Sequence, residues 1–181
     1  MFSFDAYKDN LLSVFDIRSG GLAIYGGVIG AVLTIVVYCR KKKINIGTVL
    51  DILSVGLLIG QAIGRWGNFV NAEAFGCETS LPWAMTIEEN GKIIANGVHP
   101  TFFYESLWNA VGILILMIYK KHSRFRGELF CAYLVWYGAG RAIIEGLRTD
   151  SLYLGDFRVS QILAAVTAVV GAVLILRGRK K

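Results

Sequence analysis

The chain has 181 residues, 55% of them hydrophobic, and a mean hydropathy of +0.54. So apolar an average argues against an ordinary water-soluble domain and favours a membrane protein. The net charge of +6 would suit a nucleic-acid partner, but the basic residues stand in short clusters between apolar segments, which is typical of membrane topology and excludes a nucleic-acid surface.

Five apolar segments approach the roughly 20 residues that a transmembrane helix needs. They are residues 21–38, 49–63, 102–119, 129–144 and 159–176, of which the second and fourth are short, with polar residues at or inside their ends. We therefore expect an all-α polytopic membrane protein with about five transmembrane helices, forming a single membrane domain over residues 1–181. The first nineteen residues are mixed and polar, and we expect no secretory signal peptide there.

The basic residues set the expected orientation. Twelve of the 19 lie in three clusters, at residues 40–43, 120–126 and 177–181, which share one side of a five-helix bundle. The positive-inside rule makes this side cytoplasmic, with some attraction for anionic lipid. We expect the N-terminus outside, the C-terminus inside, and residues 64–101 as an extracytoplasmic head.

The first apolar segment opens with glycines. The stretch SGGLAIYGGVIGAV, residues 19–32, contains five of them, including Gly26 and Gly27, and small residues let another helix or a lipid approach closely. Tyr25 stands in its middle and is either an interfacial tyrosine or a site residue.

The second apolar segment ends in GRWGNFVNAEAFG, residues 64–76. Gln61, Arg65 and Asn68 are spaced by four and three residues, so they share one face of a helix. An ionisable group at membrane depth costs at least ~2.5–3.5 kcal/mol, so such a stripe is a candidate site.

The head is expected to contain a β-hairpin. Apolar residues alternate around Asn90-Gly91, a dipeptide typical of tight hairpin turns, and we expect residues 83–87 to pair with 92–95. Whether this is a simple loop or a functional lid stays open. The three cysteines (Cys39, Cys77 and Cys131) have neither disulfide-framework nor metal-site spacing.

The third segment opens with HPTFFYESLWN, residues 99–109. Pro100 is a good helix-start residue, and His99 before it is either a hydrogen-bond partner or a base. The fourth segment ends with Tyr137, Arg141, Glu145 and Arg148, spaced by four, four and three residues, which predicts a second polar stripe.

Two interpretations of these stripes stay open. Arg141 and Glu145 alone could form an internal salt bridge that fixes helix packing. Arginines in excess of their nearby carboxylates instead predict an anion, because a guanidinium matches a phosphate bidentately. In an outer-leaflet cavity that phosphate belongs to a lipid headgroup. The candidate set is Arg65, Asn68, Asn71, Glu73, Tyr137, Arg141, Glu145 and Arg148.

Four segments together resemble the prolipoprotein diacylglyceryl transferases. GRWGNFVNAEAFG resembles the family signature, and GGLAIYGGVIG, HPTFFYES and YGAGRAIIEGLRTD match three further family segments in the family's order. The resemblance extends from about Gly20 to the C-terminus. Because members usually begin with two further helices, the chain is expected to be an N-terminally short member.

The resemblance implies a bacterial plasma (inner) membrane enzyme that moves the diacylglyceryl group from phosphatidylglycerol to the lipobox cysteine of a preprolipoprotein signal peptide. It implies a thioether product and release of glycerol 1-phosphate. The family's essential arginines match Arg65 and Arg141 and its essential tyrosine matches Tyr137. Its signature residues match Asn68, Asn71, Glu73 and Gly76, and many members have His where this chain has Tyr25.

On this interpretation Arg65 and Arg141 bind the phosphate, and Tyr137 hydrogen-bonds it or takes part in proton transfer. Glu145 or Glu73 orients an arginine, and Arg148, Gly26 and Gly27 line the substrate site. The base stays open between a tyrosine, His99 and an arginine-rich cavity that itself lowers the pKa of the thiol.

No cofactor is expected, and no metal, because carboxylates and histidines lack ligand spacing. Two other functions stay open: a small transporter or channel subunit, and a catalytically inactive truncated remnant. A solute path predicts polar residues along whole helices, whereas residues 113–118 and 162–173 stay almost wholly apolar.

Overall fold

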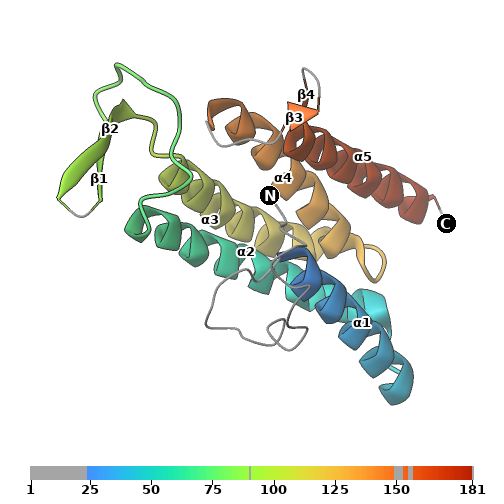
Figure 1. Ribbon diagram of the computed structural model, residues 1–181. Coiled ribbons are helices and arrows are strands. Elements are labelled where there is room, and N and C mark those ends of the chain that lie inside the picture. The colour runs from blue at the N-terminus through green and yellow to red at the C-terminus, as the bar shows by residue number, and fades with distance from the viewer. Residues whose placement is uncertain (1–23, 90, 149–152, 155–156, 181) are drawn as a thin grey trace, which may run out of the picture. The chain divides into compact units, whose positions relative to one another are not determined.

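The computed structural model describes residues 24–89, 91–148, 153–154 and 157–180 (Figure 1). The chain divides into two compact units, Met1–Ile44 and Asn45–Lys181. The first unit contains the helix α1 (Ile24–Lys42), whose last turn is basic. The second contains all the other elements.

All five apolar segments form α-helices in their described parts, and residues 21–23 of the first lie outside the described residues. In the second unit these are α2 (Ile46–Val70), α3 (Thr101–Tyr119), α4 (Glu128–Ile144) and α5 (Val159–Arg179). Short 3-10 turns follow α3 and α4, namely η4 (Lys120–His122) and η5 (Glu145–Leu147). The expectation of a mainly helical protein is confirmed.

Three described helical stretches are long and apolar enough to cross a membrane, judged by length and composition: Ile46–Val70, Thr101–His122 and Val159–Arg179. Their outer faces agree with that, because Ile52 on α2, Leu114 on α3 and Leu176 on α5 are 71%, 63% and 63% exposed. Such apolar faces suit lipid contact. The expected number of five transmembrane helices stays a prediction.

The helix α2 is longer than its apolar part suggests. The apolar segment ends at Ile63, and the spacing of Gln61, Arg65 and Asn68 predicted a helix that continues past it. The helix runs to Val70, with Asn71 as its C-cap. The continuation is supported by aromatic packing, because the Trp66 and Phe69 rings lie 5.3 and 4.8 Å from that of Phe102 on α3. The first part of the signature segment is therefore helical.

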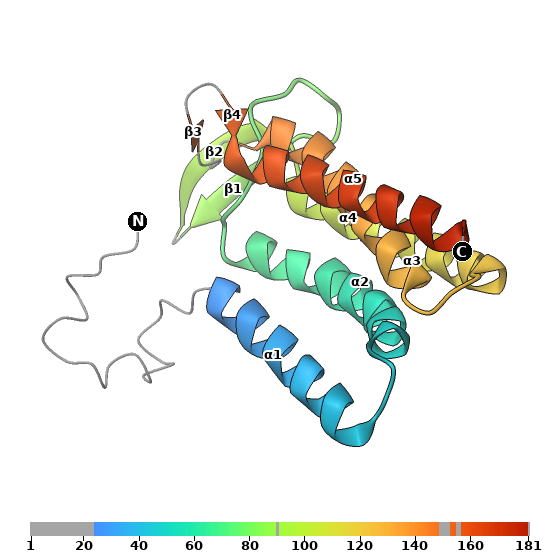
Figure 2. The same cartoon turned by 90° about the vertical axis from the view of Figure 1, so that its right-hand side faces the viewer.

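The helices α2, α3 and α4 pack on one another around Leu58, Leu116, Leu129 and Tyr133, while α5 packs along α4. Figure 2 shows α5 lying beside α4 over its length. Trp108 and Trp136 stack with their centroids 4.4 Å apart, and the Nε1 of each donates to the backbone carbonyl of the other at 3.0 Å. This reciprocal pair fixes the separation and rotation of α3 against α4.

The expected hairpin is present. Strand β1 (Met85–Glu89) pairs antiparallel with β2 (Lys92–Val98), so the first strand begins two residues later than expected and the second runs three residues further. Gly91 has φ +75°, which a tight turn requires and glycine adopts without strain. A second pairing, of β3 (Tyr153–Leu154) with β4 (Phe157–Arg158), was not predicted.

Asp51 on α2 caps the start of α4. Its two carboxylate oxygens accept hydrogen bonds from the backbone amides of Gly127 at 2.7 Å and Phe130 at 3.0 Å. We expect Asp51→Ala to destabilise the folded chain by roughly 1–2 kcal/mol, because two amides at a helix start lose their acceptor. Thermal unfolding in detergent measures this. An unchanged midpoint would contradict the capping role.

Candidate functional site

Glu105 is the centre of a cluster of arginines. It lies on the second turn of α3 and is only 5% exposed. Its carboxylate pairs with Arg65 Nη2 at 2.7 Å, Arg141 Nη1 at 3.1 Å and Arg148 Nη1 at 3.5 Å. Three cations from three different elements therefore converge on one buried anion, which we call the Glu105 cluster.

Arg141 also bridges to a second carboxylate. Its Nη2 lies 2.7 Å from Glu145 Oε2, one helical turn further along. Glu145 is 1% exposed, and its backbone carbonyl accepts a hydrogen bond from Arg158. The salt bridge that was one of the two interpretations thus exists, but it is part of a larger group.

Among the described side chains of the cluster, arginines outnumber carboxylates. Arg65, Arg141 and Arg148 face two carboxylates, Glu105 and Glu145. The side chains of Arg65 and Arg141 are 19% and 18% exposed, so both can be reached from outside. A largely buried group of arginines, two of which can be reached from outside, is suited to bind an anion.

Arg148 reaches the cluster by a different route from the one expected. Its spacing predicted a helical stripe, but α4 ends at Ile144, a 3-10 turn follows, and Arg148 itself has extended backbone (φ −79°, ψ 148°). Gly76 forms an antiparallel bridge with Arg148, and the Cys77 amide donates to the Leu147 carbonyl at 2.8 Å. The head segment, and not helical periodicity, positions this arginine.

Two hydrogen bonds next to Arg65 join α2 to α3. Trp66 Nε1 donates to Ser106 Oγ at 3.2 Å, and Ser106 Oγ donates to the Ala62 carbonyl at 2.8 Å. Because these bonds join α2 to α3 beside Arg65 and Glu105, they fix the two helices in register at the ion pair.

Tyr137 is half-buried on α4 and adjoins the cluster. Its ring stacks on Tyr133 at 5.8 Å, and the Tyr133 hydroxyl accepts from Gln61 Nε2 at 3.0 Å. Tyr137, Glu105 and Arg141 line a cavity of about 10 Å³, which is roughly the space of one water. The two predicted polar stripes therefore do face each other.

The rest of the signature segment forms a tight loop after α2. Ala72 and Ala74 have φ of +53° and +58°, a left-handed backbone that is uncommon for residues other than glycine. The Asn68 carbonyl accepts from the Glu73 amide at 3.0 Å, and Asn71 Nδ2 donates to Glu73 Oε1 at 3.3 Å. Glu73 thus contacts Asn71, whereas Glu145 contacts Arg141.

Gly76 is required by packing. A Cβ there would lie 2.6 Å from the Cβ of His99 and 3.0 Å from Cγ2 of Thr101. The Gly76 amide donates to the His99 carbonyl at 3.0 Å, so the two segments run side by side. Its predicted role in substrate binding stays a prediction.

His99 belongs to an aromatic hydrogen-bond chain. Its Nδ1 lies 3.2 Å from the Tyr104 hydroxyl, which accepts from Trp83 Nε1 at 2.7 Å. These contacts link the head to the start of α3 and agree with the expectation of a hydrogen-bond partner. Tyr25, Gly26 and Gly27 lie in α1, in the first unit, and their roles stay predictions.

Glu105 and Arg158 were not among the predicted site residues. Neither shares a helix face with the arginines of the signature, so the spacing that identified the others could not find them. Within the described part of the chain, no group of three or more His, Cys, Asp or Glu residues could hold a metal.

Apolar helices with a buried cluster of arginines and carboxylates at one end define a membrane protein with a polar site at a helix end. The chain belongs to the prolipoprotein diacylglyceryl transferase family, whose sequence profile matches residues 1–177. The resemblance predicted from the four motifs is thereby confirmed.

Named relatives agree with this membership. A phosphatidylglycerol–prolipoprotein diacylglyceryl transferase of Finegoldia magna is 45% identical over 182 residues, which cover 100% of this chain and 71% of the relative. Proteins of the same name are 46% identical in Listeria monocytogenes (100% and 68% covered) and 43% identical in Bacillus cereus (99% and 69% covered). The chain is thus similar to bacterial transferases over its whole length.

Proposed function

We propose that this chain transfers the diacylglyceryl group of phosphatidylglycerol to the thiol of a prolipoprotein cysteine. The acceptor is the lipobox cysteine of the signal peptide. A sulfur–carbon bond forms at the glyceryl carbon, the carbon–oxygen bond to phosphate breaks, and glycerol 1-phosphate leaves. The observation that carries the proposal is the convergence of Arg65, Arg141 and Arg148 on Glu105 in a chain of this family.

The arginines supply the phosphate chemistry. Arg65 and Arg141 are partly exposed, and each presents several N–H donors, of which the carboxylates use only some. As the carbon–oxygen bond breaks, negative charge develops on the phosphate, and fixed guanidinium groups stabilise it without reorganising. Glu105 and Glu145 hold the planar guanidinium groups of these arginines in position. Arg148 supplies further positive charge.

The thiol must lose its proton before it attacks. A free cysteine has a pKa of about 8.5, and nearby arginines favour the thiolate. Arg65 and Arg141, which are partly exposed, are placed to lower the pKa of a thiol bound beside them. Tyr137, stacked on Tyr133 and next to Arg141, is placed to hydrogen-bond the phosphate or relay the proton.

The cluster lies at the ends of helices opposite to the basic ends, so we place it toward the outer leaflet of the bacterial plasma membrane. The C-terminus is then cytoplasmic. Phosphatidylglycerol and the signal peptide both reach that position by lateral diffusion in the membrane.

Direct assay tests the function. The full chain is expressed in membranes and supplied with phosphatidylglycerol and a lipobox peptide, and the product is identified by the mass of the diacylglyceryl thioether. Product supports the proposal. If neither this chain nor a version extended at its N-terminus gives product, an inactive remnant is favoured instead.

Arg141→Lys tests the phosphate role. Lysine keeps the charge but loses the planar fork that spans Glu105 and Glu145, so we expect turnover to fall by about tenfold or more. The rate of thioether formation measures this, with Arg124→Lys in the exposed loop after α3 as the matched control. Near-normal turnover of Arg141→Lys would contradict a bidentate role.

A further inference from the structure

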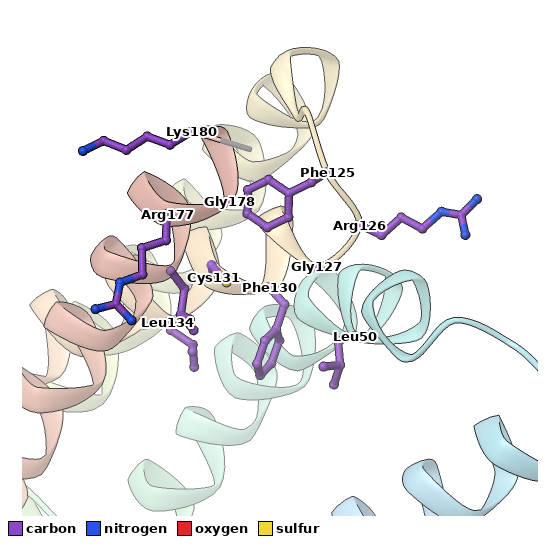
Figure 3. Close-up of a pocket in the computed structure, with 11 residues that line it drawn as sticks. Leu50, Phe125, Arg126, Gly127, Phe130, Cys131, Leu134, Arg177, Gly178 and Lys180 are labelled. Atoms are coloured by element: carbon purple, nitrogen blue, oxygen red, sulfur yellow. The ribbon is translucent and has the colours of Figure 1, made fainter.

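A groove lies at the end of the second unit that carries the basic helix ends (Figure 3). It is bounded by the first turns of α2 and α4, the loop before α4 and the last turns of α5. Its volume of about 860 Å³ is within the range of roughly 300–1,000 Å³ typical of ligand sites. It is lined by Leu50, Phe125, Arg126, Gly127, Phe130, Cys131, Leu134, Leu174, Arg177, Gly178 and Lys180.

Close backbone contacts build the walls of the groove. A Cβ at Gly47 would lie 2.7 Å from the Arg126 carbonyl oxygen, so α2 touches the loop directly. Gly178 on α5 lies against the Phe125 ring, where a Cβ would overlap it. Because Asp51 also binds the backbone amides at the start of α4, the groove is formed in advance of any ligand.

The groove has an apolar centre and a basic rim. Arg126, Arg177 and Lys180 are exposed, and within the described residues none of them has an ion-pair partner. In Figure 3 their charged ends reach away from the centre, Arg126 on one side and the other two on the opposite side. No acidic residue lines the groove.

Two described acids lie near the groove, and both already have partners. Asp51 accepts hydrogen bonds from the amides of Gly127 and Phe130. Glu128 is fully buried, with Arg179 Nε at 2.6 Å, the Tyr119 hydroxyl at 2.8 Å and the amide of Arg124 at 2.5 Å from its carboxylate. Glu128 therefore neutralises Arg179 and leaves the rim positive. Among the described residues that line the groove, none is acidic, so an anion at the rim lies against basic side chains.

The groove is separate from the Glu105 cluster. Leu50 and Arg65 both lie on α2, and at 1.5 Å per residue their positions differ by about 22 Å along the helix. The arginine cluster and this rim therefore belong to opposite ends of the helices, and one lipid headgroup cannot contact both.

We propose that this groove binds an anionic phospholipid of the cytoplasmic leaflet, in addition to the lipid used in the reaction. Its headgroup lies at the rim, between Arg126 and the basic end of α5. An acyl chain packs on Phe130 and Leu134 of α4 and on Leu174 of α5, which is long and apolar enough to cross a membrane. The argument is charge complementarity joined to an apolar wall, since basic pockets between membrane helices on the cytoplasmic side suit anionic headgroups.

Native mass spectrometry of the delipidated full chain tests this. The probes are dioleoylphosphatidylserine, an anionic lipid, and dioleoylphosphatidylcholine, which has no net charge. We expect the triple variant Arg126→Gln, Arg177→Gln, Lys180→Gln to bind phosphatidylserine about 10- to 100-fold more weakly. Lipid bound at the Glu105 cluster is common to all variants and cancels in the comparison.

The matched control removes the same charge elsewhere. Arg40→Gln, Lys41→Gln, Lys42→Gln changes three basic residues of α1, and we expect phosphatidylserine binding within about twofold of the unaltered chain. An equal loss in this control would show bulk charge and overturn the proposal. So would equal binding of phosphatidylcholine, or an unchanged triple variant.

A steric variant separates the groove from the surface. Leu174→Trp places a larger ring at an exposed wall residue without altering charge, and we expect it to weaken phosphatidylserine binding by several-fold. Unaltered binding in Leu174→Trp would mean that the lipid is held outside the groove. No phosphatidylserine bound by the unaltered chain would mean that other protein covers it. Either result overturns the proposal, and neither depends on transferase activity.

Discussion

Glu105→Gln is expected to lower the rate of diacylglyceryl transfer by at least about 100-fold. Glu105 is almost fully buried and holds Arg65, Arg141 and Arg148 around one carboxylate. An amide has one acceptor oxygen and turns N–H donors toward guanidinium groups that are themselves donors only. With the central charge gone, the arginines repel one another and the phosphate site loses its geometry.

The measurement is the rate of thioether formation with phosphatidylglycerol and a lipobox peptide, taken together with thermal unfolding. Glu88→Gln is the matched control, because Glu88 is exposed on β1 and lies outside the cluster. We expect its rate to stay near that of the unaltered chain. A folded Glu105→Gln chain with near-normal turnover would contradict the proposal that Glu105 positions the arginines.

The helices were predictable because each depends on local composition. All five apolar segments are helical in their described parts, and the third begins at Thr101, one residue before its expected start. The end of α2 was predictable only in part, because the spacing of Gln61, Arg65 and Asn68 indicated a helix past Ile63 but not the residue at which it ends. Hydropathy falls after Ile63, but Trp66 and Phe69 find Phe102 on another helix, and that tertiary contact supports seven further helical residues.

The site was predictable only where its residues share a helix. Spacing alone placed Gln61, Arg65 and Asn68 on one face, and Tyr137 and Arg141 on another. It could not identify Glu105, whose partners Arg141 and Arg148 are 36 and 43 residues away along the chain. Nor could it show that α4 ends before Arg148, since that depends on pairing with Gly76 in the head.

The four motifs nevertheless pointed to the family because the chemistry constrains residue types in several distant segments at once. Three features each restrict the residue types of a different segment. They are the arginines of the Glu105 cluster, the tight loop that follows the C-cap Asn71, and the packing of Gly76 against His99. The four motifs together, in the family's order, are therefore specific to this family. The packing that supports them, such as the paired tryptophans, leaves no comparable short motif.

Gly140→Ala is expected to cost both stability and activity. A Cβ at Gly140 would overlap the Trp108 indole, which is itself locked by its hydrogen bond to the Trp136 carbonyl. Overpacking of this kind costs roughly 1–3 kcal/mol, and relief requires α3 to move away from α4. Because Trp108 is one turn from Glu105 and Gly140 adjoins Arg141, that movement also lengthens the Glu105–Arg141 contact.

We therefore expect the unfolding midpoint of Gly140→Ala in detergent to fall by several degrees and transfer to fall by about tenfold. Gly56→Ala on α2 is the matched control, since nothing lies within 4 Å of its new Cβ and alanine favours a helix. That variant should unfold at the same temperature or higher, with unaltered turnover. If Gly140→Ala behaved like Gly56→Ala, the paired tryptophans would not set the separation of α3 and α4, and the position of Glu105 would depend on its ion pairs alone.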